Sequence, residues 1–184
     1  MNESLLPGEK VLATRPANLM FGFEVDAAKL AANHPLLILP KLIPLLAKAR
    51  SLGGKLHLTT YRLLFETHRL NSTRGTCSVF LPTIIYDEPV TGPFAGQWVV
   101  KTRAAGHRFA VRDPKELSQL LRQTQEKPLD AAELRTHVKG NLQKVSEGIG
   151  PLVESKDLES VIKEKRANAL QLLGVMNAHD LLNP

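Results

Sequence analysis

The stretch GGKLHLTTYRLLFETH, residues 53–68, carries the clearest structural signal in the chain. Leu56 and Leu58 alternate with polar neighbours before a short break, and Leu63 and Phe65 alternate in the same way after it. Alternation with a period of two residues is typical of strands that bury one face. The break, 59–62, holds no Gly or Asn for a tight two-residue turn. We therefore predict two antiparallel strands joined by a longer bend or a bulge.

Other segments show strand patterns of the same kind. They are Lys10–Thr14, which Arg15-Pro16 should close, Ser78–Leu81, Ile84–Glu88 and the hairpin from Trp98 to Val111. Pro82 is expected at a corner, because proline cannot donate a hydrogen bond inside a sheet. In the hairpin, alternation places four apolar side chains inside, namely Trp98, Val100, Phe109 and Val111. It places four basic side chains outside, namely Lys101, Arg103, Arg108 and Arg112.

Three helices are predicted after the last strand. The first begins at Asp113-Pro114 with Glu116 three residues after the expected cap, and it buries Leu117, Leu120 and Leu121. The second is capped by Asp130 and carries the stripe Leu134, Val138, Leu142 and Val145. The third opens at Ser155 and stops at Gly174, before a terminal tail from Val175 to Pro184. The last two helices have no core of their own, so they either pack on the sheet or bind a partner.

The strand pair resembles the signature of the GRAM domain, a pleckstrin-homology-like module. The matching positions are Gly54, Leu56, Leu58, Thr59, Arg62, Leu63 and Phe65. The same residues also look like the related GLUE module of the endosomal sorting machinery. The resemblance implies an α+β fold, a pleckstrin-homology-like β-barrel of about seven strands with a C-terminal capping helix. It implies a GRAM/PH-like domain over residues 1–126. The helices predicted after it form a C-terminal helical extension over 127–184.

A helical insertion, residues 24–52, departs from the pattern of that family. A short loop is expected between the first two strands, whereas some thirty apolar and basic residues stand there. Asp26 suits a helix N-cap, and Pro40 and Pro44 divide the remainder into short helical pieces or kink it. Its apolar run is shorter than the roughly 20 residues that a spanning helix needs. The insertion therefore either covers the barrel or touches a membrane without crossing it.

Composition restricts the class of protein. The 184 residues are 43% hydrophobic, enough for one full core, and the net charge of +6 mildly favours acidic partners. Cys77 is the only cysteine, so an internal disulfide is impossible and a reducing compartment fits. The start, MNESLLPGEK, lacks the basic and apolar regions of a secretory signal. We expect a cytoplasmic protein that can bind peripherally to a membrane.

No motif for catalysis or metal binding is visible. The six histidines are scattered without the spacing of a zinc site, and His57 and His68 are expected as a surface pair on neighbouring strands. Cys77 is expected as a small packed side chain rather than a nucleophile. The sequence contains no phosphate loop, dinucleotide fingerprint or nucleophile elbow. We therefore expect a binding module without enzymatic activity, cofactor or metal.

Three binding hypotheses follow. By resemblance, the module recognises anionic phospholipid head groups, with the candidate residues Lys41, Lys48, Arg50, Lys55, Arg62 and Arg74. The membrane-contact candidates are Leu36, Leu37, Leu42 and Ile43. The place of Arg62 in the motif also allows a structural role at the bend. The loop from Leu70 to Thr76 is expected to be exposed, together with Arg69.

The second hypothesis is a protein-interaction module. The insertion or the late helices would then join a partner or a second copy in a homodimer. The third hypothesis, a nucleic-acid surface on the basic hairpin, is disfavoured because no aromatic ring is interleaved with those charges.

Overall fold

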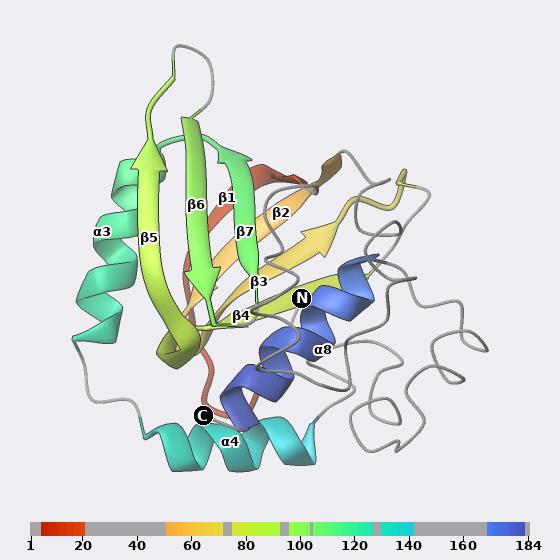
Figure 1. Cartoon of the computed structure of the whole chain (residues 1–184), viewed down its shortest axis with the longest axis vertical. Helices are drawn as coiled ribbons and strands as arrows, with labels where there is room; N and C mark the ends of the chain where they lie inside the picture. Colours follow the sequence, from red (N-terminus) through yellow and green to blue (C-terminus); the bar gives the residue numbers. More distant parts are fainter. Residues whose placement is uncertain are drawn as a thin grey trace.

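The computed structural model describes residues 5–20, 51–71, 75–92, 96–103, 105–126, 130–141 and 169–182. Seven strands form one antiparallel sheet in the order β4-β3-β2-β1-β7-β6-β5 (Figure 1). Their bounds are β1 Val11–Met20, β2 Ser51–Thr59, β3 Arg62–Thr67, β4 Thr76–Phe80, β5 Ile84–Val90, β6 Gly96–Thr102 and β7 Gly106–Val111. The helices are α3 Pro114–Gln125, α4 Ala131–Gly140 and α8 Ala169–Leu182, with a short 3-10 helix at Leu81–Thr83. This is an α+β architecture.

The central strand pair forms as predicted, and the structure supplies its register. Leu56 lies opposite Phe65 and Leu58 opposite Leu63, and all four side chains are buried in the main core. The bend between the strands is organised by the Thr59 hydroxyl, which accepts hydrogen bonds from the backbone N–H groups of Tyr61 and Arg62 at 3.1 and 2.9 Å. A side-chain oxygen thus satisfies the turn without the glycine that a tight hairpin requires.

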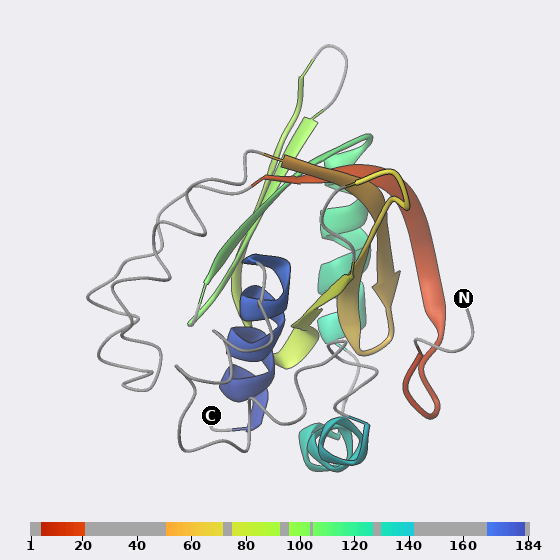
Figure 2. The same ribbon diagram turned by 90° about the vertical axis from the view of Figure 1, so that its right-hand side faces the viewer.

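The sheet is bent into two layers that face each other (Figure 2). Strand β1 joins them, because it pairs with β2 along its length and with β7 from Ala17 to Met20. Between the layers, the rings of Phe65 on β3 and Phe109 on β7 lie 6.1 Å apart between centroids. Trp98 and Phe109 of the second layer are also fully buried there, as the alternation of the last hairpin predicted.

The predicted closed barrel is wrong in one respect. Strands β4 and β5 are the two edges of the sheet, and they are joined by the 3-10 helix Leu81–Thr83 rather than by a hydrogen-bonded ladder. Pro82 begins that helix, so its place at a corner is confirmed. Helix α3 packs against β5 and β6, and α8 packs against β4. Both helices also contact the 3-10 helix between the two edge strands, so helices complete the shell that strands leave open (Figures 1 and 2).

The first strand is longer than predicted. It continues through Pro16 to Met20, although Arg15-Pro16 was expected to close it. Strand β7 pairs only from Ala17 onward, so one side of β1 is open at Pro16, where a missing N–H is tolerated. Strand β2 begins at Ser51 and contains Gly53 and Gly54, so the sheet resumes before the predicted end of the insertion. Most of the insertion lies outside the described residues.

Helix α3 begins where predicted, with Pro114 in its first turn, but without the predicted side-chain cap. Asp113 adopts φ 55° and ψ 52°, and its side chain makes no cap hydrogen bond, so the predicted capping box does not form. In contrast, Asp130 caps α4 as predicted, because its carboxylate accepts from the N–H groups of Ala132 and Glu133. Leu134 and Val138 of α4 are buried, whereas Leu142, Val145 and Ser155 lie outside the described residues.

The predicted stop at Gly174 and the predicted terminal tail are wrong. Helix α8 runs through Gly174 to Leu182, and almost every described side chain on it is buried. Leu170, Leu173 and Met176 belong to the same core as the sheet. Ala178 and Leu181 join a second cluster with Leu6, Phe80, Leu134 and Val138. Tertiary burial therefore stabilises the helix despite its glycine. The side chains of α8 that the structure describes leave little surface for a partner.

Candidate functional site

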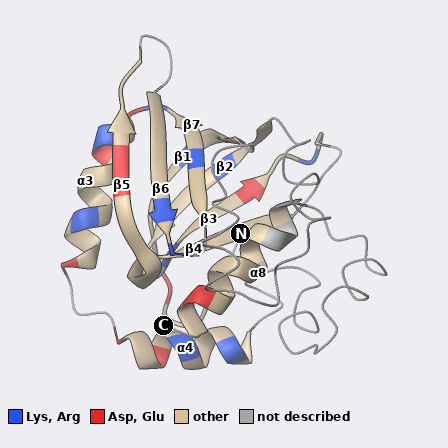
Figure 3. Ribbon diagram, in the orientation of Figure 1, with Lys and Arg blue, Asp and Glu red and all other residues tan. Residues whose placement is uncertain are grey.

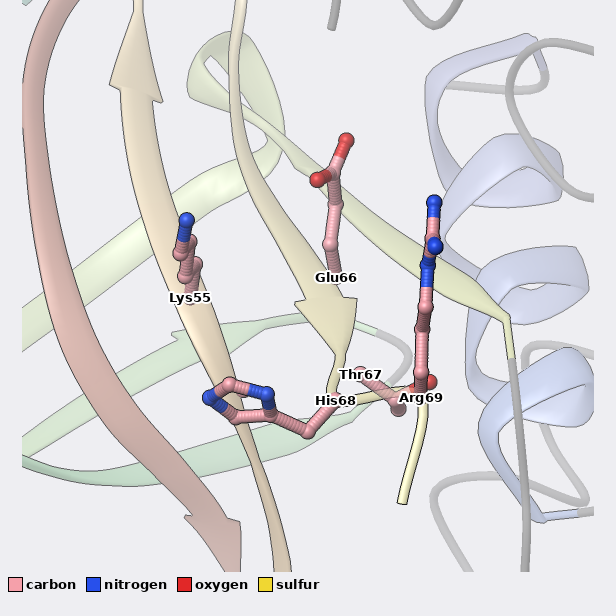
Figure 4. A pocket seen from close by; sticks show the side chains of 6 residues that line it. Lys55, Glu66, Thr67, His68 and Arg69 are labelled. Atoms are coloured by element: carbon pink, nitrogen blue, oxygen red, sulfur yellow. The ribbon is translucent and has the colours of Figure 1, made fainter. Parts of the chain in front are cut away.

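A surface hollow lies on the outer face of strands β2 and β3, near Thr67, where β3 ends. Its volume is about 400 Å³, and it is lined by Gly54, Lys55, Glu66, Thr67, His68 and Arg69. Strands β2 and β3 bring Lys55 directly opposite Glu66, and the turn after β3 adds His68 and Arg69. In Figure 4 the Lys55, Glu66 and Arg69 side chains extend to the same side, and the His68 ring lies near the base of the group. The site therefore brings together the basic side chains of Lys55 and Arg69 and the carboxylate of Glu66.

Gly54 shapes the floor of the hollow. A Cβ atom at this position would lie 2.1 Å from the carbonyl oxygen of Glu66 and 2.8 Å from the ring of Phe65. Real Cβ atoms do not approach a backbone atom so closely, so β2 and β3 can pair in this register only with glycine here. The glycine that belongs to the predicted signature is thus explained by strand packing.

Glu66 has a buried histidine as its neighbour. His57 lies beneath it, with Nε2 at 3.6 Å from the Glu66 carboxylate and Nδ1 at 2.8 Å from the Thr14 hydroxyl. Burial lowers the pKa of His57, and the attraction of Glu66 offsets only part of that effect. His57 with a lowered pKa therefore favours its neutral form and adds no positive charge beside the hollow. His57 is buried and His68 exposed, so the predicted surface pair of histidines is wrong.

Of the candidate lipid-binding residues, the described part of the chain contains two. Lys55 is exposed and lines the hollow, whereas Arg62 lies at the other end of the hairpin with no exposed surface. The guanidinium of Arg62 binds the Glu9 carboxylate through Nε at 2.9 Å and Nη2 at 3.0 Å, and it donates to the Ser78 hydroxyl. Arg62 is therefore corrected from a lipid contact to a structural residue, the alternative that its place in the motif allowed.

The remaining candidates lie outside the described residues. They are Lys41, Lys48, Arg50 and Arg74 for lipid binding, and Leu36, Leu37, Leu42 and Ile43 for membrane contact. The connection that holds most of them leaves the sheet at Met20 and returns at Ser51, two residues that pair across β1 and β2. The backbone N–H of His68 donates to the carbonyl of Gly53 at 2.9 Å, so this end of the sheet adjoins the hollow.

Sequence reasoning missed the contributions of Glu66, His68 and Arg69 to this site. Arg69 was placed in an exposed loop, which is correct, but was not grouped with Lys55. The available signal was the alternation itself, because it puts Lys55 and Glu66 on the polar face of paired strands. Figure 3 shows the acidic position on β3 between basic positions on β2 and on the following turn.

The basic residues of the last hairpin form a separate surface. Lys101, Arg103 and Arg112 are exposed, and Arg108 is partly buried. The Lys101 amine lies 5.5 Å from the ring centre of Tyr86 on the neighbouring strand, and that ring is half-exposed. One aromatic side chain therefore does accompany these charges, contrary to the expectation, although it comes from β5 rather than from the hairpin.

Three observations concern metal binding, the cysteine and membrane-spanning helices. Within the described ranges, no three His, Cys, Asp or Glu side chains gather closely enough to hold a metal ion. Cys77 is a packed core side chain, as predicted, and burial raises the pKa of its thiol to about 12. No helix in the described part of the chain is long and apolar enough to cross a membrane.

Comparison with known proteins gives structural likenesses alone. Neither a family model nor a curated protein matches the sequence. Among solved structures, the chain is similar to a "Vps36 N-terminal PH domain", with 16% identity, a TM-score of 0.43, and coverage of 66% of this chain and 83% of that one. It is also similar to the C-terminal domain of an unknown protein from Leishmania infantum, with 14% identity, a TM-score of 0.42, and coverage of 66% and 88%.

Proposed function

We propose that this protein is a non-catalytic binding module that attaches peripherally to membranes by recognising anionic phospholipid head groups. The observation that carries the proposal is the hollow in which Lys55 and Arg69 extend to one side of the β2–β3 hairpin. Both side chains are exposed, so they can bind a phosphate without losing a buried partner. The resemblance of the same hairpin to a GRAM or pleckstrin-homology-like signature supports this class of ligand.

Glu66 refines the choice of ligand. The Glu66 carboxylate between two basic side chains repels a bare anion, but it can accept a hydrogen bond from a hydroxyl or ammonium group. Phospholipid head groups combine a phosphate with donors of this kind. The hollow therefore suits a head group with both functions better than a simple anion. Replacing Glu66 by Gln should strengthen attraction to anionic membranes in general and weaken discrimination among head groups.

Cosedimentation with vesicles tests the proposal. We expect the full chain to bind vesicles of equal parts phosphatidylcholine and phosphatidylserine, and the variant Lys55→Glu/Arg69→Glu to bind them at least about tenfold more weakly, since each basic residue at such a surface contributes roughly fivefold. The matched control is Lys115→Glu/Lys139→Glu, which changes the net charge equally at two exposed positions on α3 and α4.

The outcomes separate the hypotheses. Equal loss in both double variants would mean that net charge, not the hollow, governs binding. Binding that survives the hollow variant but is lost in Lys41→Glu/Lys48→Glu would move the site to the insertion. Absence of vesicle binding by the parent chain would overturn the lipid proposal.

A further inference from the structure

Leu70 is the most exposed large apolar side chain in the described part of the protein. It is 96% exposed and follows Arg69 directly, at the rim of the hollow. A single exposed leucine is common on protein surfaces and means little by itself. The inference rests on how this leucine is held and on what surrounds it.

The turn that carries Leu70 is tied to the sheet on both sides. The side-chain amide of Asn71 donates to the Gly53 carbonyl at 2.6 Å, and the His68 N–H donates to the same oxygen. The Asn71 N–H closes the turn on the His68 carbonyl at 3.0 Å. These bonds hold the backbone around Leu70 in a defined turn. Little conformational entropy is therefore lost when this turn enters a membrane or binds a partner.

The base of the same loop is clamped as well. The N–H of Thr67 donates to the Gly75 carbonyl, and the Gly75 N–H donates to the Thr67 hydroxyl at 2.9 Å. Gly75 adopts φ 144°, a conformation that residues with a side chain rarely adopt. The loop therefore leaves and rejoins the sheet at a fixed point beside the hollow.

The surroundings of Leu70 favour a bilayer over a protein partner. The other exposed large apolar side chains are Leu12, Ile85, Tyr86 and Val90. Leu12 lies at the opposite end of β1–β2, where Val11 pairs with Thr59, and the others lie on β5 at the far edge of the sheet. No apolar patch therefore forms around Leu70 in the described residues, as a protein interface would need. The residue directly before it is instead the basic Arg69, which lines the hollow together with Lys55.

We propose that Leu70 inserts into the acyl region of an anionic bilayer while Arg69 and Lys55 bind the phosphates of its head groups. This inference rests on the proposed function and specifies which point of the molecule enters the membrane. An apolar tip beside basic side chains matches the layers of such a bilayer, in which hydrocarbon lies below a negatively charged surface.

Fluorescence of Leu70→Trp tests insertion directly. The native Trp98 is fully buried, so its emission provides a constant background. With vesicles of equal parts phosphatidylcholine and phosphatidylserine, we expect the emission of the added tryptophan to shift to the blue and to be quenched by lipids brominated on their acyl chains. Val90→Trp, on the far edge strand, is the matched control and should remain unquenched.

Affinity measurements separate this inference from the function on which it rests. We expect Leu70→Ser to bind the vesicles about tenfold more weakly, from the apolar surface that stays in water, and to bind soluble glycerophosphoserine as the parent does. If the parent binds vesicles and Lys55→Glu/Arg69→Glu does not, but Leu70→Ser binds normally and the added tryptophan is not quenched, insertion is disproved and head-group binding stands. If the parent binds no vesicles, both fail. If Leu70→Ser instead abolishes self-association in solution, a protein contact replaces the bilayer.

Discussion

At the scale of single residues, the ion pair between Arg62 and Glu9 ties the N-terminal segment to the hairpin. Both side chains have no exposed surface, and the Glu9 carboxylate also accepts from the Leu6 N–H at 2.7 Å and from the Thr59 hydroxyl at 2.6 Å. Two buried charges are tolerated because each carries several hydrogen bonds from the other or from its neighbours. The bend of the hairpin, the segment before β1 and β4 thus meet at one polar centre.

Replacing Arg62 by Met should destabilise the protein by about 3–5 kcal/mol, because it leaves the Glu9 carboxylate buried without its counter-charge. Chemical denaturation measures this change. The double variant Glu9→Gln/Arg62→Met should lose much less than the sum of the two single losses, since no charge then remains buried. Additive losses would show that the pair does not act as a unit. Vesicle binding normalised to folded protein should be unchanged in either variant.

At the scale of elements, the buried side chain of Asn177 joins α8 to the sheet. Asn177 donates through Nδ2 to the Ser78 carbonyl on β4 at 2.8 Å, and its Oδ1 lies 3.1 Å from Nε2 of His107 on β7. One side chain on the helix therefore binds both layers of the sheet. A buried asparagine of this kind fixes the position of the helix, because any displacement along its axis would leave polar groups unsatisfied.

This contact predicts a pH dependence. Burial lowers the pKa of His107 from 6.5 to about 4, although the hydrogen bond with Asn177 acts in the opposite direction. The unfolded chain binds the proton more readily, so the contribution of neutral His107 is complete above pH 6.5 and is lost as the pH falls toward about 4. Within that window the parent should lose up to about 1.4 kcal/mol per pH unit relative to His107→Gln.

Denaturation of the parent and of His107→Gln, followed between neutral pH and the lower end of that window, measures the difference. His57, whose pKa is also lowered, changes in both proteins and cancels in the comparison. His68→Gln provides the same substitution at an exposed position. Parallel stability curves for the parent and His107→Gln would show that His107 takes up its proton equally well in the folded state.

At the scale of the whole molecule, the main core contains residues from both sides of the predicted domain boundary at the end of α3. The predicted domain, residues 1–126, would lack Leu170, Leu173 and Met176, which pack among the sheet residues of the main cluster. It would also lack α4 and the C-terminal half of the second cluster. The gap between the edge strands β4 and β5 makes α8 necessary as a covering element, because strands alone do not close this shell.

A chain truncated after Glu126 should therefore fail to unfold cooperatively, and it should bind an apolar dye that the full chain excludes. The truncation removes several large apolar side chains from the core, and each of them contributes about 1.5–3 kcal/mol when buried. Their summed contribution is comparable with the total stability of a small domain. Thermal unfolding of the fragment and of the full chain provides the measurement. A fragment with the same cooperative transition as the full chain would show that residues 1–126 fold as an independent domain, as predicted.

The order of local elements could be read from the sequence. Period-two alternation gave the β2–β3 pair and the β6–β7 hairpin with the correct buried faces, because a one-residue slip would expose Leu56 or Trp98 to water. The Asp130 cap of α4 was found because its hydrogen bonds lie within four residues. Signals that act over a few residues are visible in the chain itself. The position of Lys55 on the polar face of β2 belongs to the same class.

Tertiary contacts decided everything that depends on residues distant in sequence. Gly174 has the character of a helix stop, but burial against β4 outweighs the cost of about 1 kcal/mol for a glycine within a helix. Arg62 resembled a free cation until the fold placed Glu9 beside it, 53 residues away. The hollow exists because Gly53 holds the turn of His68 and Asn71 against β2. Sequence alternation thus determined which faces are buried, whereas long-range packing decided which charges remain available to bind a ligand.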